Sequence, residues 1–480
     1  MSWREGVVYQ IYPRSFQDSN DDGVGDLAGI TARLDHLVWL GVDALWISPF
    51  YPSPLADFGY DVSDYTDVDP IFGALPDFDR LAAAAHERGL KVLLDLVACH
   101  TSIQHPWFRD HPEWYVWSKG DAPPNNWTSA FGGPAWSRYD DERWYLHSFY
   151  PEQPDLDWRN PEVVAAMQEV VRFWVARGAD GFRLDAIDRL AKDTAFRDDP
   201  PSDEPFGLPL MEHELGRDLR YSRNAEWIGE ALGAIREAAG DALLIGEVYL
   251  PAHKHVHYLE HLDRSFVFEL ILSGWDPAQL RAAIAAGAAT EGRFGPGAAW
   301  ALSNHDFGRF STRFGRANER GAALMLMTLP GTATLYQGDE IGQGTGAAGD
   351  PPYDRVGRDG FRNPMQWDGT RGGGFSAAEP WLPLTDPQER NVADQRDDPD
   401  SLLHFWRKLI GLRRDLGPGF RIVESEAGII AYERGDKLVA INAGDQPAVV
   451  PPGEPVLATS AAAAQDGRLA PGDGVLMSRA

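Results

Sequence analysis

Carboxylic acids follow several short apolar runs in this sequence, at Asp95, Asp185, Glu247 and Asp306. Enzymes cleave glycosidic bonds with retention by means of one carboxylate and one carboxylic acid whose carboxyl groups lie about 5 Å apart. If the apolar runs are parallel strands whose carboxyl ends lie at one edge of a sheet, these acids come close together. The spacing therefore indicates glycoside hydrolysis.

Asp185 and Glu247 differ in their expected surroundings, and this difference predicts their roles. Arg183 lies two residues before Asp185, on the same side of a strand, and a guanidinium keeps a neighbouring carboxylate ionised, as a nucleophile requires. Like charges around Glu247 would raise its pKa, which suits a general acid that later acts as a base. Any one of these acids could instead be half of a core salt bridge, but the whole set favours catalysis.

A repeated unit supplies the elements that would position these acids: an amphipathic helix, a glycine that ends it, and a short apolar strand. It is clearest where Gly41 separates a helix over 27–40 from a strand over 44–47. Near-continuous apolar strands that alternate with helices are typical of a parallel sheet covered on both faces. Further helices are expected at 78–88, 161–177, 227–239 and 319–329, and further strands at 7–12, 91–97, 181–184, 242–248, 265–270, 298–302 and 332–336.

Eight such units favour an α/β fold of the (β/α)₈ barrel (TIM barrel) type over the alternative, an open doubly wound sheet. The chain length and the polar residues after several separate strands support the barrel. Residues 101–157 are rich in Trp, Pro, Gly and Asn, which predicts a subdomain inserted after the third strand. The expected domains are the barrel in two parts, 1–100 and 158–405 with an irregular loop region over 342–400, the inserted subdomain B over 101–157, and a C-terminal helix and small β module over 406–480.

Four motifs around the acids resemble the signatures of the α-amylase superfamily, glycoside hydrolase family 13. The resemblance covers nearly the whole chain, and it implies that Asp185 is the nucleophile, Glu247 the acid/base and Asp306 the stabiliser of the transition state. The motifs are Asp95–His100, Gly181–Asp185, Gly246-Glu247 and Asn304-His305-Asp306.

Three positions depart from the family pattern. Cys99 and Asp157 stand where Asn is usual, and Phe307-Gly308 replaces a common Gln-Pro. None of them changes a catalytic acid, so the departures bear on specificity and on how the third strand end is held.

Closer matches narrow the resemblance to α-glucosidases and oligo-1,6-glucosidases, which release glucose from a non-reducing end. The matching segments are Val8–Phe16, Gly59–Val62, Gln153–Leu156 and Arg362–Asp368. The resemblance implies that Tyr60 stacks under the glucose ring and that Phe131 and Ala186 line the substrate site, with the small Ala186 favouring α-1,4-linked or broad substrates over a strict α-1,6 specificity. The residues implied to hold the glucose hydroxyls are Asp61, His100, Arg183, His305 and Arg362.

An acidic loop near the start of the chain has the spacing of a cation site. Asp18, Asn20, Asp22 and Asp26 stand at alternate positions, with the main-chain oxygen of Val24 between them and a glycine at the bend. Hard cations take oxygen ligands from loops of this kind. The loop resembles the single-ion loop of α-glucosidases, so we expect a structural Ca²⁺, with Mg²⁺ as an alternative and a solvated acidic turn as the ordinary explanation.

The composition bears on partners and location. A formal charge of -28 and the lack of a basic run argue against nucleic acid, and no apolar run approaches the roughly 20 residues that span a bilayer. The one cysteine rules out an intrachain disulfide, and the first residues lack a basic patch followed by an apolar stretch, so we expect a cytoplasmic protein. The expected partner is a small α-glucoside, bound by a monomer or a small homo-oligomer.

The leading interpretation is a retaining, exo-acting α-glucosidase for maltose-type oligosaccharides, with transglucosylation when an alcohol replaces water. A sucrose-active glucosyltransferase or isomerase of the same superfamily is the enzymatic alternative, because it differs in loops and not in carboxylates. A non-catalytic relative, such as the heavy chain of an amino-acid transporter, is the alternative from another class. Such a protein needs a membrane anchor and typically lacks a catalytic acid, whereas this sequence shows no such anchor and has all three acids.

Overall fold

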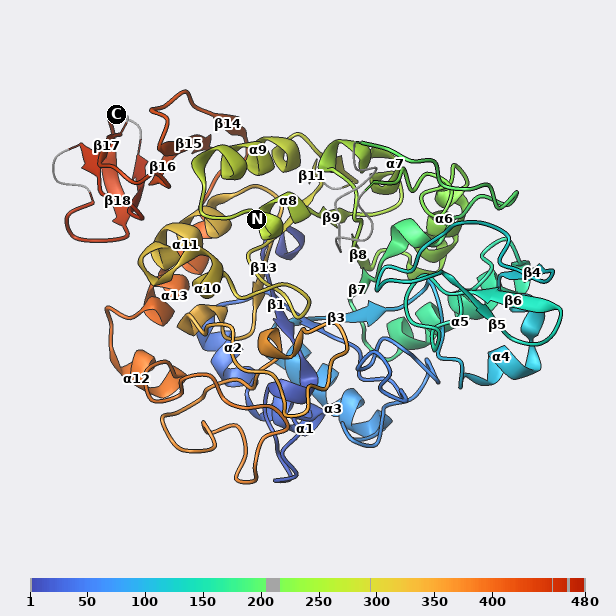
Figure 1. Cartoon of the computed structure of the whole chain (residues 1–480). Coiled ribbons are helices and arrows are strands. Elements are labelled where there is room, and N and C mark those ends of the chain that lie inside the picture. The colour runs from blue at the N-terminus through green and yellow to red at the C-terminus, as the bar shows by residue number, and fades with distance from the viewer. Residues whose placement is uncertain (1, 204–215, 294, 451, 464–466, 479–480) are drawn as a thin grey trace. The chain divides into compact units, whose positions relative to one another are not determined.

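Eight parallel strands form a closed barrel in the computed structural model, which describes residues 2–203, 216–293, 295–450, 452–463 and 467–478 (Figure 1). Almost all residues of these strands are buried, as the apolar runs predict. The barrel is confirmed and the open sheet is excluded. The strands are β1 (Val7–Ile11), β2 (Ala44–Ile47), β3 (Lys91–Leu96), β7 (Gly181–Leu184), β8 (Leu243–Gly246), β9 (Arg264–Phe266), β12 (Ala298–Ala301) and β13 (Thr332–Tyr336), in the spatial order β1-β13-β12-β9-β8-β7-β3-β2.

The register of β3, β7 and β8 aligns three of the expected acids. Asp95 lies opposite Arg183, and the residues just before Asp185 and Glu247 lie opposite one another. Parallel strands present their carboxyl ends at one face of a barrel, so these side chains start from the same level.

The helices between the strands mostly begin and end near the predicted residues. Asn160 caps its helix by accepting a hydrogen bond from the main-chain N–H of Glu162, and Pro161 is the first helical residue. In the part of the chain that the structure describes, every helix is too short or too polar to cross a membrane. The longer helices are α3 (Leu75–Glu87), α5 (Pro161–Ala176), α6 (Ile228–Ala239), α9 (Pro277–Ala288), α11 (Glu319–Thr328) and α13 (Leu402–Arg413), and the shorter ones are α4 (Pro106–Asp110), α7 (Val256–Leu259), α8 (Phe268–Leu272), α10 (Phe310–Phe314) and α12 (Val392–Asp397).

Two predicted elements are wrong in form. The expected helix over 27–40 is two helices, α1 (Leu27–Ala32) and α2 (Leu34–Leu40), which break at Arg33. A hydrogen bond to Gln17 and stacking on Trp367 fix the Arg33 side chain, and no local pattern shows these distant contacts. The expected strand over 265–270 ends at Phe266 and is followed by α8, because so short an apolar run fits either element.

The chain divides into two compact units, which we describe separately. One unit contains Trp46–Ala83 and Val92–Phe266, with Asp185, Glu247 and the inserted subdomain. The other contains Met1–Leu45, Ala84–Lys91 and Val267–Ala480, with Asp306 and the C-terminal module.

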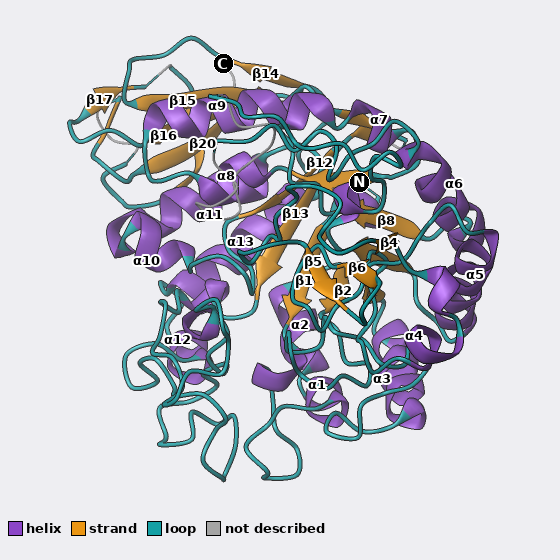
Figure 2. Ribbon diagram, turned by 45° about the vertical axis from the view of Figure 1, so that its right-hand side comes forward, coloured by secondary structure: helices purple, strands orange, loops and turns teal. Residues whose placement is uncertain are grey.

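The inserted segment contains a small antiparallel sheet, whose short strands are drawn in orange in Figure 2. Its strands are β4 (Trp117–Lys119), β5 (Trp136–Arg138) and β6 (Arg143–Leu146), with β6 in the centre. Trp127 and Trp136 pack in its core with Leu146.

The C-terminal module is a five-stranded antiparallel sheet that follows α13. The sequence predicts short β segments at 428–432, 437–442 and 448–450, where strands of the module do form, but it misses the other strands. In spatial order the sheet contains β14 (Phe420–Ile422), β15 (Ile429–Arg434), β16 (Lys437–Asn442), β20 (Gly474–Ser478) and β18 (Glu454–Ala458). In the same module β17 (Ala448–Val449) pairs with β19 (Arg468–Leu469). Outside this module, β10 (Glu291–Gly292) pairs with β11 (Gly295–Pro296).

The buried side chain of Arg413, at the end of α13, holds three segments together. Its guanidinium donates hydrogen bonds to the main-chain oxygens of Met327 and Leu329, at 2.8 Å each, where α11 ends. It also donates to the main-chain oxygens of Gly331 and Glu5. Removing this side chain would leave several buried oxygens without a donor, which is costly for each of them.

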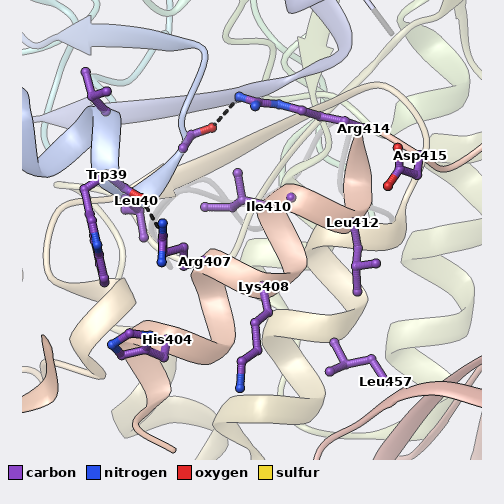
Figure 3. A pocket seen from close by; sticks show the side chains of 13 residues that line it. Trp39, Leu40, His404, Arg407, Lys408, Ile410, Leu412, Arg414, Asp415 and Leu457 are labelled. Carbon is purple, nitrogen blue, oxygen red and sulfur yellow. Dashed lines mark hydrogen bonds between the residues drawn. The ribbon is translucent and has the colours of Figure 1, made fainter. Parts of the chain in front are cut away.

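A groove of about 660 Å³ lies between the end of α2 and α13 (Figure 3). Its cationic side chains do not converge on one point. Arg407 donates to the main-chain oxygen of Trp39 and Arg414 to that of Gly41, while Lys408 points away from both. These contacts join the two helices and do not create an anion site.

Candidate active site

Arg183 lies at the centre of a buried group of charged side chains, Asp95, Arg183, Asp185 and Glu247, which we call the Arg183 cluster. One terminal nitrogen of the guanidinium donates to Asp95 Oδ1 at 2.7 Å and to Asp185 Oδ1 at 2.6 Å. The other terminal nitrogen contacts Glu247 Oε1. Only 1% of the Arg183 side chain is exposed, so strands β3, β7 and β8 place three carboxyl groups around one buried cation.

The shared guanidinium governs protonation in this cluster. Burial raises the pKa of Asp95 in spite of its contact with Arg183. Burial also lowers the pKa of Arg183, but Asp95 and Glu247 outweigh that effect and hold the pKa well above its ordinary value. Arg183 therefore stays charged, and the three carboxyl groups share this one guanidinium.

The main chain turns sharply after Asp185. Ala186 has φ 40° and ψ 45°, a left-handed conformation that residues with a side chain rarely adopt. Its N–H donates to Glu247 Oε2 at 3.1 Å, and the N–H of Ile187 donates to the main-chain oxygen of Glu247 at 3.1 Å. The turn thereby ties the end of β7 to the end of β8.

Tyr60 contacts the Arg183 cluster, and two other residues predicted to bind glucose, Asp61 and His100, lie next to Tyr60. The Tyr60 hydroxyl donates to Asp95 Oδ2 at 3.1 Å, and His100 Nε2 lies 3.0 Å from the main-chain oxygen of Tyr60. Asp61 is buried and accepts hydrogen bonds from Ser53 and two main-chain N–H groups, and burial raises its pKa. Burial lowers the pKa of His100, so its imidazole is neutral.

Phe131 and Ala186 are linked through Phe149, which sequence reasoning misses. Phe149 packs with Ala186, and its ring centroid lies 5.3 Å from that of Phe131 and 5.1 Å from that of His100. The inserted subdomain therefore forms an aromatic wall beside Asp185. No motif points to Phe149, because it stands in an irregular stretch with many aromatic residues.

In the other unit, two arginines hold Asp306, and we call Asp306, Asp354, Arg358 and Arg362 the Asp306 cluster. Arg358 and Arg362 each donate to Asp306 Oδ1, at 2.9 and 3.0 Å. His305 Nε2 lies 3.3 Å from Asp306 Oδ2. The structure thus brings three predicted residues together, His305, Asp306 and Arg362.

Arg358 joins this cluster although the sequence gives no sign of it. Asp354 accepts two hydrogen bonds from Arg358, at 3.0 and 2.7 Å, and also lies 3.6 Å from Arg362. Asp359 accepts hydrogen bonds from the N–H groups of Tyr353 and Asp354, which folds the loop that carries Arg358. Arg358 is 52 residues from Asp306 in the chain, so no local spacing reveals the contact.

Cys99, His100 and Asp155 form a group whose possible ligand atoms lie within 4.8 Å of one another. A lysine already supplies the positive charge, because Lys192 Nζ lies 2.5 Å from Asp155 Oδ2 and 3.7 Å from Cys99 Sγ. Burial raises the pKa of the Cys99 thiol to about 12, and Lys192 occupies the place beside Asp155 that a cation would take. These residues do not fit a metal, and Lys192 instead holds the strand end at which Cys99 replaces the usual Asn.

The acidic loop over 18–26 bends around its own side chains. Asp18, Asn20 and Asp22 each accept a hydrogen bond from the N–H two residues later, at 3.0, 3.0 and 2.8 Å. Asp26 caps α1. The side chains of Asp18, Asn20, Asp22 and Asp26 all offer oxygen atoms as metal ligands, which fits a hard cation.

Comparisons with known proteins agree with this fold. The family model for the catalytic domain of alpha amylase matches residues 10–417. A protein of Rhizobium meliloti named probable alpha-glucosidase is 43% identical and aligns with 90% of this chain and 87% of its own. Two solved structures match 99% of this chain and 99% of their own: the alpha-glucosyl transfer enzyme XgtA (TM-score 0.91, 36% identity) and the trehalulose synthase MutB of Pseudomonas mesoacidophila MX-45 (TM-score 0.88, 30% identity).

Proposed function

Because the chain belongs to the α-amylase family, we propose that it is a retaining, exo-acting α-glucosidase that releases glucose from the non-reducing end of small α-glucosides. The Arg183 cluster carries the proposal, since one guanidinium contacts both the proposed nucleophile and the proposed acid/base. A single guanidinium is narrow, so the pair suits the separation of retaining enzymes, about 5 Å, better than the roughly 6.5–9.5 Å of inverting ones.

In the first step, Asp185 attacks the anomeric carbon while Glu247 protonates the departing glycosidic oxygen. The bond from the anomeric carbon to the leaving sugar breaks as the bond to the Asp185 carboxylate forms. Arg183 contacts Asp185 and orients its carboxylate for this attack.

In the second step, Glu247 is a carboxylate and acts as a base. It takes a proton from water, whose oxygen then displaces Asp185 from the anomeric carbon. Two displacements at the same carbon release glucose in the α configuration.

We assign Asp306 to stabilisation of the transition state. Two guanidiniums favour its ionised form and hold its orientation, so it offers a fixed negative charge as positive charge develops on the sugar. The glucose itself is proposed to contact Tyr60, Asp61, His100, Phe131, Arg183, His305 and Arg362.

Hydrolysis of p-nitrophenyl α-glucoside by the wild type and by Asp185→Ala tests the proposal. We expect kcat to fall by about 10⁵-fold in the variant, because no nucleophile remains. The control is Asp79→Ala, which removes a surface pair with Arg177. Undiminished activity of Asp185→Ala, or β-glucose as the first product seen by NMR, would overturn the mechanism.

Glucosyl transfer or sucrose isomerisation is a second candidate, favoured by the similarity to XgtA and MutB. A covalent glucosyl-enzyme can pass its glucose to an alcohol as well as to water, so the same acids serve both reactions. Incubation with sucrose, followed by chromatography for isomers and longer saccharides, distinguishes them. Formation of glucose and fructose alone would leave hydrolysis as the activity.

A preference for α-1,4 bonds, or a broad specificity that includes them, is part of the proposal, supported by the small side chain of Ala186 beside the nucleophile. Maltose and isomaltose supplied at equal concentration compare the two linkages directly. Equal or faster turnover of isomaltose would contradict the preference.

We also propose that the acidic loop binds a structural Ca²⁺, or Mg²⁺, through Asp18, Asn20, Asp22, Asp26 and the main-chain oxygen of Val24. Elemental analysis should find one ion per chain, and a chelator should lower the melting temperature, because an ion that binds only the folded state stabilises it. The control is re-addition of the ion, which should restore the melting temperature. No stoichiometric metal, together with an unchanged melting temperature in chelator, would remove the idea.

We propose a cytoplasmic enzyme that acts as a monomer or small homo-oligomer, without nucleic acid or membrane. The formal charge of -28 supports the exclusion of nucleic acid. Fractionation of cells with the glucosidase assay tests the location, and sedimentation tests the assembly. Activity confined to the culture medium would overturn the cytoplasmic location.

A further inference from the structure

Ala186 keeps a strained main chain in a tightly packed place. Its left-handed conformation is unfavourable for a residue with a side chain. Its methyl group is buried against Ala130 and Phe149, so the strain persists within a fixed environment. Strain that the surroundings maintain beside a reactive group points to a role in function.

The strained turn changes the direction of the main-chain N–H groups. The N–H of Asp185 still pairs with the main-chain oxygen of Leu96 in β3, at 3.0 Å. The next N–H, of Ala186, instead meets Glu247 Oε2, and that of Ile187 meets the main-chain oxygen of Glu247. Two consecutive N–H groups therefore hold both the side chain and the main chain of the proposed acid/base.

We infer that the main-chain N–H of Ala186 is a positioning group for Glu247, an inference that rests on the proposed glucosidase function. An amide N–H can only donate, so it favours the carboxylate form that Glu247 needs in the second step. Because Arg183 contacts Oε1 and Ala186 contacts Oε2, the carboxyl group is held at both oxygens. The left-handed turn is what directs this donor at Glu247.

Replacement of Ala186 by lactic acid in cell-free translation tests the inference, because lactic acid keeps the methyl group and exchanges the N–H for an ester oxygen. We expect kcat for maltose to fall by about 100-fold with KM changed by less than about threefold, since general base catalysis is worth about 10²–10⁴-fold.

Azide gives a readout that a purely structural role would not move. With 2,4-dinitrophenyl α-glucoside the leaving group needs no proton, so the second step limits turnover in the ester variant. Azide needs no general base, and it forms a bond to the anomeric carbon as the bond to Asp185 breaks. It should raise kcat of the ester variant by at least about tenfold, with α-glucosyl azide as the product, and should leave the wild type unchanged.

Ala74 supplies a matched control, since its N–H donates to Asp77 Oδ2 at 2.9 Å at an exposed helix start. Lactic acid at this position should change neither kcat nor the response to azide. Ala186→Gly keeps the N–H and takes the left-handed conformation freely, so azide should not raise its kcat, whatever the loss of the methyl group from the substrate site does to KM. This variant keeps the test decisive even if the ester variant fails to fold.

Three outcomes separate the possibilities. Wild-type kinetics in the ester variant, or an Ala186→Gly variant that loses kcat and responds to azide as Glu247→Ala would, overturns the inference and leaves the glucosidase in place. If the wild type does not hydrolyse the aryl glucoside at all, the proposed function fails instead.

Discussion

The Arg183 cluster and the Asp306 cluster bury charge in opposite proportions. The first gives three carboxyl groups one guanidinium, and the second gives two carboxylates two guanidiniums. A buried charge without an opposite charge is unfavourable, so the excess of carboxyl groups in the first cluster favours the binding of a proton, whereas the charges of the second cluster balance. The first environment suits a proton donor, and the second suits a permanent carboxylate.

Removal of the shared cation should have the largest effect. In Arg183→Met, three buried carboxyl groups lose their common guanidinium, so the free energy of unfolding should fall by about 3–5 kcal/mol. Loss of the charge that orients both catalytic acids should lower kcat/KM by at least about 10³-fold. Urea unfolding and p-nitrophenyl α-glucoside kinetics measure the two effects.

Arg177→Met is the control for this change, because it breaks an exposed pair with Asp79 and should cost less than about 1 kcal/mol. An Arg183→Met protein as stable and as active as this control would contradict the proposed balance of charge in the cluster.

The buried pair of Lys192 and Asp155 has one cation for one carboxylate, a ratio that can be compared with those of the two clusters. Both side chains are buried, so Lys192→Met leaves Asp155 without its cation and should lower the free energy of unfolding by about 3 kcal/mol. Addition of Asp155→Asn should recover most of the loss, because the double variant buries no charge at this point. Urea unfolding of both single variants and the double variant measures the coupling, and additive losses would show that the pair does not interact.

Removal of one guanidinium from the Asp306 cluster should have a smaller effect, because Arg362 remains. In Arg358→Gln we expect kcat/KM to fall by about 30-fold, equivalent to one charged hydrogen bond of about 2 kcal/mol. Arg358→Lys should recover part of the activity. The control is Arg371→Gln at an exposed pair with Glu379, and an Arg358→Gln enzyme that matches this control would show that Arg362 suffices.

Buried neutral imidazoles should make the folded protein less stable in acid. Burial lowers the pKa of His105 and His255 to about 4, whereas the unfolded chain has a value near 6.5. The unfolded chain therefore binds more protons between these values, so stability that is complete above about pH 6.5 is lost as the pH falls towards 4. The slope should reach about 1.4 kcal/mol per pH unit for each histidine.

Urea unfolding at pH 7, 6 and 5 measures this slope, and His255→Gln should reduce it by the share of one histidine. Stability that does not change across this range would refute the proposed neutral state of both side chains.

The strands and the acids that follow them could be predicted because each strand is a short buried apolar run and a barrel places all its strand ends on one face. The bounds of β2 and β13 agree with the predicted ranges to the residue. The break at Arg33 could not be predicted, since Gln17 and Trp367 hold that side chain from other segments.

Partners of the predicted residues were harder to predict than the residues themselves. Arg358 reaches Asp306 across 52 residues, and Lys192 reaches Cys99 across 93. Neither contact produces a recognisable residue spacing in the sequence, because both arginine and lysine are common in loops. The sequence therefore identifies groups that react, while the groups that set their charge and orientation appear only once the chain is folded.

The four carbonyls held by Arg413 bear on how this protein can be recombined with its relatives. The boundary predicted at residues 405 and 406 falls inside α13, and a chain cut there loses the guanidinium that joins the end of α11 to Glu5. A crossover at that point would combine the barrel of one parent with the Arg413 side chain of another. Chimeras should therefore exchange the C-terminal sheet only after residue 416, with the whole of α13 inherited together with the barrel.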